Sequence, residues 1–253
     1  MRALPWILGG GAAALAAYYW RRSPTDRTDD ASSKGASPGT DATTAAPERL
    51  PGRWVWPVGI WRDRKPEISD GFFSKRRLPT GQVVTHGGVD IMYRRRADDP
   101  WLAGTPNGSP GWVMPNRRAA LAAADGVVLS AANTPRGWTV VIDHAPRGFA
   151  TYYTHLSSLL VAAKQPVKAG TPIGIIGADP LDGEHLMHLH FELWRGDASH
   201  RFDPQRLIET TWEYVPDPGD QPGLVARNGT HRPPDGGRYL VDVRPHTRRS
   251  PRR

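Results

Sequence analysis

Five short β-type segments, separated by Gly, Pro and Asn, constrain the fold of this chain more than any other feature. The segments are 126–132, 138–144, 149–155, 172–177 and 188–194. No long stretch of the sequence has the 3.6-residue periodicity of a helix, apart from a short candidate helix within 117–124. The 27 Gly and 25 Pro among 253 residues supply many turns between such segments. The sequence therefore predicts a mainly β fold, an antiparallel sheet or sandwich with few short helices.

The composition limits the chemistry that a functional site can use. Cysteine is absent, which excludes disulfides, thiolate metal ligands and cysteine nucleophiles. A metal site must therefore be built from His, Asp and Glu. The formal net charge is +8, with arginine clusters at 75–77, 94–96 and 117–118. These clusters could attract polyanions, such as nucleic acid, anionic lipid or anionic cell-wall polymers, or be merely solvated. Because they lack interleaved aromatic residues, we expect no nucleic-acid partner.

The N-terminal segment is compatible with two targeting roles. Residues 3–20 carry no charge and end in Tyr18, Tyr19 and Trp20. This stretch is just long enough to span a bilayer, and aromatic residues favour the membrane interface. Small residues at 14–16 also fit the cleavage site of a signal peptide. We expect residues 1–22 to form a membrane anchor or a signal peptide, and we favour the retained anchor.

Composition divides the rest of the chain into three regions. Residues 23–53 contain few large apolar side chains, which predicts a disordered linker or tether. The β-type segments fall within 54–213, the expected folded domain, in which 94–116 resembles an inserted loop. Residues 214–253 are rich in Pro and Arg and are expected to form a basic tail, with one stray edge strand at 237–245.

A pair of histidines two residues apart lies in the last β-type segment. On a strand alternate residues share a face, so His188, His190 and Glu192 should point the same way. The opposite face carries Leu189, Phe191 and Leu193. A polar face on an otherwise apolar strand indicates a lined cleft. By itself, however, a His-x-His pair arises easily by chance in a chain with nine histidines.

Two further segments contain histidines in suggestive places. In the first, His86 and Asp90 lie on either side of Gly87-Gly88, a pair that disfavours a helix. We expect a flexible turn that brings both side chains to one point, as a metal site requires. In the second, 151–155, alternation places Thr151, Tyr153 and His155 on one strand face, with His155 at the strand end.

Together these segments read H-x3-D, Y-x-H-L and H-x-H-F-E in order along the chain. This series resembles the lysostaphin/LytM-type zinc endopeptidases, which cleave peptide bonds in bacterial peptidoglycan. The likeness covers about residues 54–208 and includes landmarks at 124–128, 167–177 and 202–208. It implies the lysostaphin-like (duplicated hybrid motif) fold for this region.

The resemblance also implies a role for each motif residue. His86, Asp90 and His190 would hold one Zn²⁺ per chain, while His155 and His188 would line the site as catalytic proton carriers. Two imidazoles and one carboxylate leave a fourth position open for water, as catalytic zinc requires. No H-E-x-x-H occurs in the sequence, so histidine is the expected proton carrier. The remaining histidines are expected to be surface or structural residues: His144, His185, His200, His231 and His246.

One segment departs from the family pattern. Members often have a Gly/Ser/Thr-rich turn before the H-x-H strand, whereas residues 177–187 read GADPLDGEHLM. The two aspartates and the glutamate should change the charge of the substrate groove. The insertion at 94–116 follows the first metal-ligand segment and is a candidate wall or cover for the cleft.

The resemblance implies an enzyme that hydrolyses peptide cross-links or stem peptides of peptidoglycan, outside the cytoplasm in the periplasm or cell wall. The alternative is a catalytically inactive LytM-like domain that binds cell wall or regulates other wall hydrolases. We favour the enzyme because all five motif positions are retained. A sugar-binding or isomerase-like β-barrel would leave the Y-x-H-L segment unexplained. The owner is either a bacterium that remodels its own wall, or a phage virion or secretion machine that breaches one.

Overall fold

The computed structural model describes residues 49–77, 81–99, 105–181 and 186–218. The expected anchor or signal peptide, almost all of the linker, the edge strand at 237–245 and three histidines lie outside these ranges. Those histidines are His185, His231 and His246. No helix among the described residues is both long enough and apolar enough to cross a membrane.

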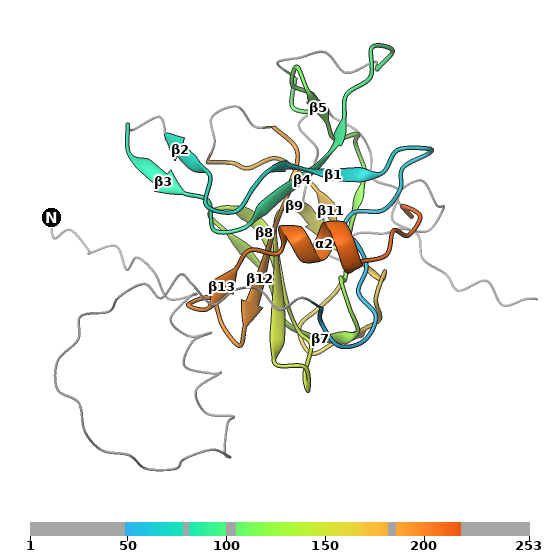
Figure 1. The fold of residues 1–253 in the computed structure, drawn as a ribbon, viewed down its shortest axis with the longest axis vertical. Coiled ribbons are helices and arrows are strands. Elements are labelled where there is room, and N and C mark those ends of the chain that lie inside the picture. Colours follow the sequence, from blue (N-terminus) through green and yellow to red (C-terminus); the bar gives the residue numbers. More distant parts are fainter. Residues whose placement is uncertain (1–48, 78–80, 100–104, 182–185, 219–253) are drawn as a thin grey trace, which may run out of the picture.

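One antiparallel sheet of eleven strands dominates the described structure (Figure 1). Its main path runs in the order β1 (Pro66–Asp70), β4 (Val89–Arg94), β12 (Leu189–Arg195), β9 (Phe149–Leu159), β8 (Gly137–Asp143), β7 (Gly126–Thr134) and β10 (Pro166–Val167). Four strands branch from this path: β5 (Trp112–Val113) from β4, β13 (Arg201–Phe202) from β12, and β11 (Pro172–Ile176) from β9, with β6 (Ala119–Leu121) beyond β11. The prediction of a mainly β, antiparallel, lysostaphin-like fold is confirmed.

Two smaller elements complete the described fold. A separate hairpin of β2 (Lys75–Arg77) and β3 (Val83–Thr85) projects to one side of the sheet (Figure 1). The short helix α2 (Gln205–Thr211) buries Leu207 and Ile208 in the main core. All five predicted β-type segments are strands, each within a few residues of its expected bounds.

The short helix predicted within 117–124 is wrong. The middle of this alanine-rich stretch is strand β6, which pairs with β11, and the residues around it are turn, bend or irregular. Backbone bonds continue beyond the strand: Val55 N donates to Ala123 O at 2.8 Å, and Ala122 N donates to Thr171 O at 2.9 Å. Neighbouring segments therefore satisfy the backbone polar groups that a helix would pair internally, and this tertiary pairing overrides the helix propensity of alanine.

The two ends of the described fold pack against each other. Residues 54–61 run parallel to residues 213–217, through bridges that join Val55 to Glu213 and Ile60 to Pro216. Tryptophans from the first segment are buried in the main core. From the second segment, Asp217 forms a buried ion pair with Arg118 at 2.6 Å. The packed unit therefore continues through Asp217.

Candidate metal centre

Three side chains predicted to bind a metal converge on one point. His86 Nε2 lies 2.9 Å from His190 Nδ1, and each of these nitrogens lies 3.1 Å from Asp90 Oδ1. All three residues are buried. Donor atoms bound to one tetrahedral zinc ion are separated by about 3.3 Å, because zinc–nitrogen bonds are about 2.0–2.1 Å long. Among the described residues, these three form the group whose donor atoms are close enough to share a metal ion.

Strand pairing creates this convergence. Asp90 on β4 is the direct register partner of His190 on β12, so their side chains meet across the sheet. His86 reaches the same point from just before β4, across Gly87-Gly88. The expected bend is therefore present at the glycines and both side chains reach one point, with Asp90 itself on strand β4.

The side-chain atoms of His86 and Asp90 that face away from the shared point also have hydrogen-bond partners. His86 Nδ1 donates a hydrogen bond to Gly71 O at 2.9 Å, which leaves Nε2 free to act as a ligand. The Arg76 guanidinium bonds Asp90 Oδ2. Burial alone would raise the pKa of the Asp90 carboxyl, but the neighbouring histidines hold that pKa well below its usual range. Such outer partners orient metal ligands, so the arrangement fits a metal site.

His188 lies immediately before β12 with one ring nitrogen unpaired. Its Nδ1 donates to Leu186 O at 2.8 Å, so Nε2 carries the lone pair of the neutral ring. Nε2 is buried, has no hydrogen-bond partner among the described residues and lies 3.5 Å from Asp90 Oδ2. A buried, unpaired nitrogen beside the donor cluster is available to a water molecule or substrate there.

His155 reaches the same site through an unusual backbone conformation. It lies within β9, not at the strand end, and its φ of 62° is in the left-handed region that non-glycine residues rarely adopt. Its ring lies 4.7 Å from that of His188 and 5.6 Å from that of His190, measured between centroids. Its Nδ1 donates to Arg136 O at 3.1 Å. Burial, together with the neighbouring histidines, holds the pKa of His155 well below its usual range.

The prediction that Thr151, Tyr153 and His155 share one strand face is wrong, because of this backbone conformation at His155. Tyr153 packs against Phe191 and is bonded to Thr151 in the core, on the side away from the metal donors. Thr151 and Tyr153 therefore do not share a face with His155. Tyr152, one residue away, is the aromatic that contacts the ring of His190.

Asp179 is a site residue that the sequence analysis missed. Its carboxylate is buried, and Oδ2 lies 3.5 Å from His155 Nε2. It belongs to the acidic segment 177–187, which was expected only to alter the charge of the groove. Its position beside His155 depends on tertiary pairing that leaves no periodic signal in the sequence.

One protein-family model matches part of the chain. Residues 111–204, which include His155, His188 and His190, match the model of peptidase family M23. Over this segment the chain is similar to M23 peptidases. The resemblance found in the sequence is thereby confirmed, and the structure brings His86 and Asp90, which precede the matched segment, to the same centre.

Two relatives of the chain are named as peptidoglycan DD-endopeptidases. The chain is 35% identical over 130 residues to peptidoglycan DD-endopeptidase ShyB of Vibrio cholerae, and 34% identical over 134 residues to ShyA of the same species. These alignments cover 50% and 52% of this chain but 25% of each relative, so the chain spans about a quarter of their length.

Solved structures similar to this chain include peptidases of known fold. The lysostaphin catalytic domain of Staphylococcus simulans is 20% identical, with a TM-score of 0.42 over 58% of this chain and 94% of that one. A zinc-containing peptidase from Vibrio cholerae is 28% identical, with a TM-score of 0.42 over 60% of this chain and 40% of that one.

Two further histidines among the described residues lie away from the metal centre. His144 is fully buried, with Nδ1 3.0 Å from Asp125 O and Nε2 2.8 Å from Thr151 Oγ1. Burial lowers its pKa to about 4. His200 is exposed beside Asp197. They are therefore a structural residue and a surface residue, as the sequence analysis expected.

A segment of the expected insertion, 94–116, contacts the residues that lead to His188. Pro106 O accepts a hydrogen bond from Met187 N at 2.6 Å, and Asn107 Nδ2 lies 3.3 Å from Met187 Sδ. Residues 105–116 therefore support the start of the H-x-H strand from one side.

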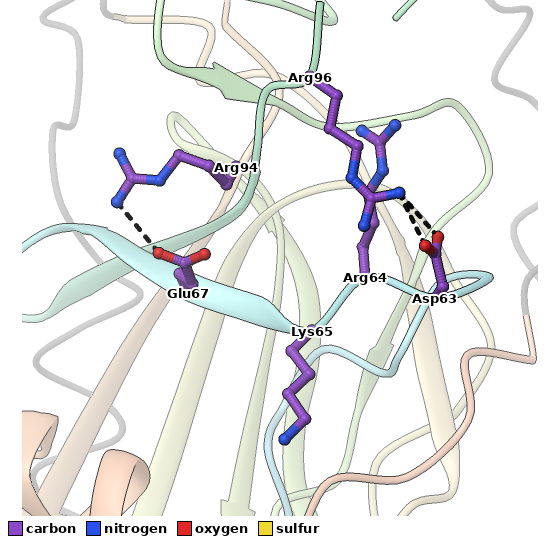
Figure 2. Close-up of a pocket in the computed structure, with 6 residues that line it drawn as sticks. All are labelled: Asp63, Arg64, Lys65, Glu67, Arg94 and Arg96. Carbon is purple, nitrogen blue, oxygen red and sulfur yellow. Dashed lines mark hydrogen bonds and ion pairs between the residues drawn. The ribbon is translucent and has the colours of Figure 1, made fainter. Parts of the chain in front are cut away.

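A separate depression of about 380 Å³ is lined by charged side chains (Figure 2). Its lining residues are Asp63, Arg64, Lys65, Glu67, Arg94 and Arg96. Arg94 pairs with Glu67 at 3.0 Å and Arg96 with Asp63 at 2.8 Å, as Figure 2 shows. Its cations are thus largely neutralised, and none of its residues belongs to the three motifs, so the donor cluster is the better candidate site.

Proposed function

We propose that this chain is a zinc-dependent endopeptidase that hydrolyses peptide cross-links or stem peptides of bacterial peptidoglycan. One observation carries the proposal: His86, Asp90 and His190 converge beside the unpaired Nε2 of His188. The match of residues 111–204 to peptidase family M23 and the likeness to two peptidoglycan DD-endopeptidases support it.

The donor set suits catalytic zinc. Two imidazole nitrogens and one carboxylate oxygen leave a fourth position open, and their mutual separations of 2.9–3.1 Å fit a single small ion. When bound, zinc supplies Lewis acidity that polarises the scissile carbonyl and makes water a better nucleophile at neutral pH.

The chain's own residues then handle the protons. His188 Nε2 accepts a proton from the attacking water, because its Nδ1 proton is committed to Leu186 O. His155, whose ring is 4.7 Å from that of His188, helps to pass a proton to the leaving amine. The Arg136 carbonyl holds His155 at the site by accepting its Nδ1 proton.

The place of action follows from the substrate. Peptidoglycan lies outside the cytoplasm, so the domain would act in the periplasm or wall space, held there by residues 3–20. Basic clusters would add attraction to anionic wall polymers. Protease added to spheroplasts should then digest the domain and leave a membrane-bound stub. If the domain resists this protease, the protein is better explained as a component of a phage virion or a secretion machine.

Zinc content and wall digestion test the proposal together. The full chain should bind one zinc ion, lose it on His86→Ala or Asp90→Ala, and release muropeptides from isolated walls, identified by mass spectrometry. Absence of bound zinc in metal-replete protein would overturn the proposal. Zinc binding without cleavage of walls of several chemotypes would favour the inactive, wall-binding or regulatory domain.

A further inference from the structure

Glu192 is a buried carboxylate directly behind one of the metal donors. It lies two residues after His190 on β12, so both side chains leave the same face of the strand, and Glu192 Oε1 lies 3.1 Å from His190 Nε2. Its other oxygen, Oε2, accepts hydrogen bonds from Trp194 Nε1 at 2.6 Å and from Arg201 Nε. A buried carboxylate is thus fixed at both oxygens, with one directed at the histidine.

This contact determines which nitrogen of His190 can bind a metal. A neutral imidazole carries one N–H, and an ionised carboxylate can only accept a hydrogen bond. Glu192 therefore keeps the proton on Nε2 and leaves the lone pair on Nδ1, the nitrogen 3.1 Å from Asp90 Oδ1. A carboxylate behind a histidine also makes the imidazole a stronger ligand.

We propose that Glu192 is a positioning residue that holds His190 in its Nδ1-ligand form and thereby sets the zinc affinity of the site. Arg201 from β13 and Trp194 from β12 hold the carboxylate in turn. This inference rests on the zinc site of the proposed function. It accounts for the glutamate of the H-x-H-F-E segment, which the proposed proton transfers leave without a role.

The backbone at Gly88 packs closely against the His190–Glu192 pair. A Cβ atom placed on Gly88 would lie 2.9 Å from Glu192 Cγ, 3.0 Å from His190 Nε2 and 2.3 Å from Phe191 O. No side chain fits there without displacing the histidine, the glutamate or β12. The absence of a side chain at Gly88 therefore lets β4 approach the His190–Glu192 pair closely.

A purely structural role predicts different results. Glu192 also joins β12 to β13 through Arg201, so its loss could lower stability without any effect on the metal. Zinc affinity and the stability of metal-free protein must therefore be measured separately on the same variants. Glu209→Gln, an exposed charge change on α2, is the matched control.

The test is zinc affinity of the full chain, measured by competition with a chromophoric chelator. Glu192→Gln should weaken zinc binding by about 10- to 100-fold, the usual effect of losing an outer-shell partner, while Glu209→Gln should match the unmodified chain. An unchanged zinc dissociation constant in Glu192→Gln overturns the inference, whatever happens to its thermal stability. If the unmodified chain binds no zinc, the proposed function itself fails. That result differs from failure of this inference alone, in which both the unmodified chain and Glu192→Gln bind zinc equally well.

A second measurement needs no variant, which matters if Glu192→Gln does not fold. Long-range ¹H–¹⁵N NMR spectra of the zinc-loaded full chain should show the His190 proton on Nε2 and the metal on Nδ1. The reverse arrangement, or a deprotonated Nε2, would overturn the inference.

Discussion

Asp70 and Asp90 are register partners on the paired strands β1 and β4, and the guanidinium of Arg76 bonds the carboxylates of both. Like charges directly opposite each other destabilise a sheet. Arg76 offsets this repulsion in the metal-free protein, whereas zinc bound at Asp90 would offset some of it in the loaded protein.

Arg76→Ala should therefore lower the stability of the metal-free protein by about 1–3 kcal/mol. Zinc should raise the melting temperature of this variant by more than it raises that of the unmodified chain. Thermal unfolding with and without chelator measures both effects. Arg77→Ala is the matched control, because Arg77 is exposed and its guanidinium bonds the carbonyl of Gly81 at 3.1 Å rather than either carboxylate among the described residues. Equal losses in the two variants would contradict the explanation.

Substitution of the two histidines of the H-x-H segment should have different effects on zinc binding. His188→Ala should retain zinc but lose about 10²- to 10⁴-fold in the rate of wall hydrolysis, because it removes a proton carrier. His190→Ala should lose both zinc and hydrolysis. Metal analysis and muropeptide release distinguish them, and a His188→Ala protein empty of zinc beside a loaded His190→Ala protein would reverse the two roles.

His144 should make the fold sensitive to mild acid. Its pKa is lowered to about 4, so the folded protein keeps the ring neutral while the unfolded chain, with a pKa near 6.5, takes up a proton. The unfolded state then binds more protons between these values, so the contribution of His144 is complete above pH 6.5 and falls as the pH drops toward 4. The loss is about 3 kcal/mol.

Urea unfolding of chelated protein at pH 7.5 and pH 4.5 measures this effect. His144→Gln removes the titrating ring, so its stability should change less between the two pH values than that of the unmodified chain. The comparison cancels the other titrating groups, and equal changes in both proteins would refute the assignment.

The boundary of the folded unit can be tested by truncation. Leu50 and Trp54 are buried in the main core, so the catalytic unit should tolerate loss of residues 1–48 but not of residues 1–56. The shorter truncation should keep its rate on soluble wall fragments. The longer one should lose at least about 3–5 kcal/mol, the usual result of removing one buried tryptophan. Misfolding of the shorter truncation would show that residues 1–48 are needed for folding.

Sequence periodicity predicted those site residues that lie on regular strands. His190 and Glu192 share a face because β12 is regular over that stretch, and the five predicted strands follow from the same alternation. The alternation of side chains failed as a guide at His155, because the left-handed conformation of that residue shifts the alternation along β9. The spacing of residues in the sequence cannot reveal such a conformation. The position of Asp179 and the strand β6 within 117–124 depend on partners distant in sequence, so local propensity could not predict them.

The parallel pairing of residues 54–61 with 213–217 determines how the domain would respond to tension. Four backbone hydrogen bonds join these segments: Trp56 N to Glu213 O, Glu213 N to Trp54 O, Ile60 N to Val215 O and Asp217 N to Ile60 O. A force that pulls the flanking chain outward at both ends slides the two segments along each other and loads all four bonds at once. In a hairpin pulled from its open end, the bonds would instead break singly and in succession. The fold is therefore closed by a shear-resistant clasp, which would suit the proposed attachment of the domain to a membrane at one end and its proposed action on a stretched wall polymer.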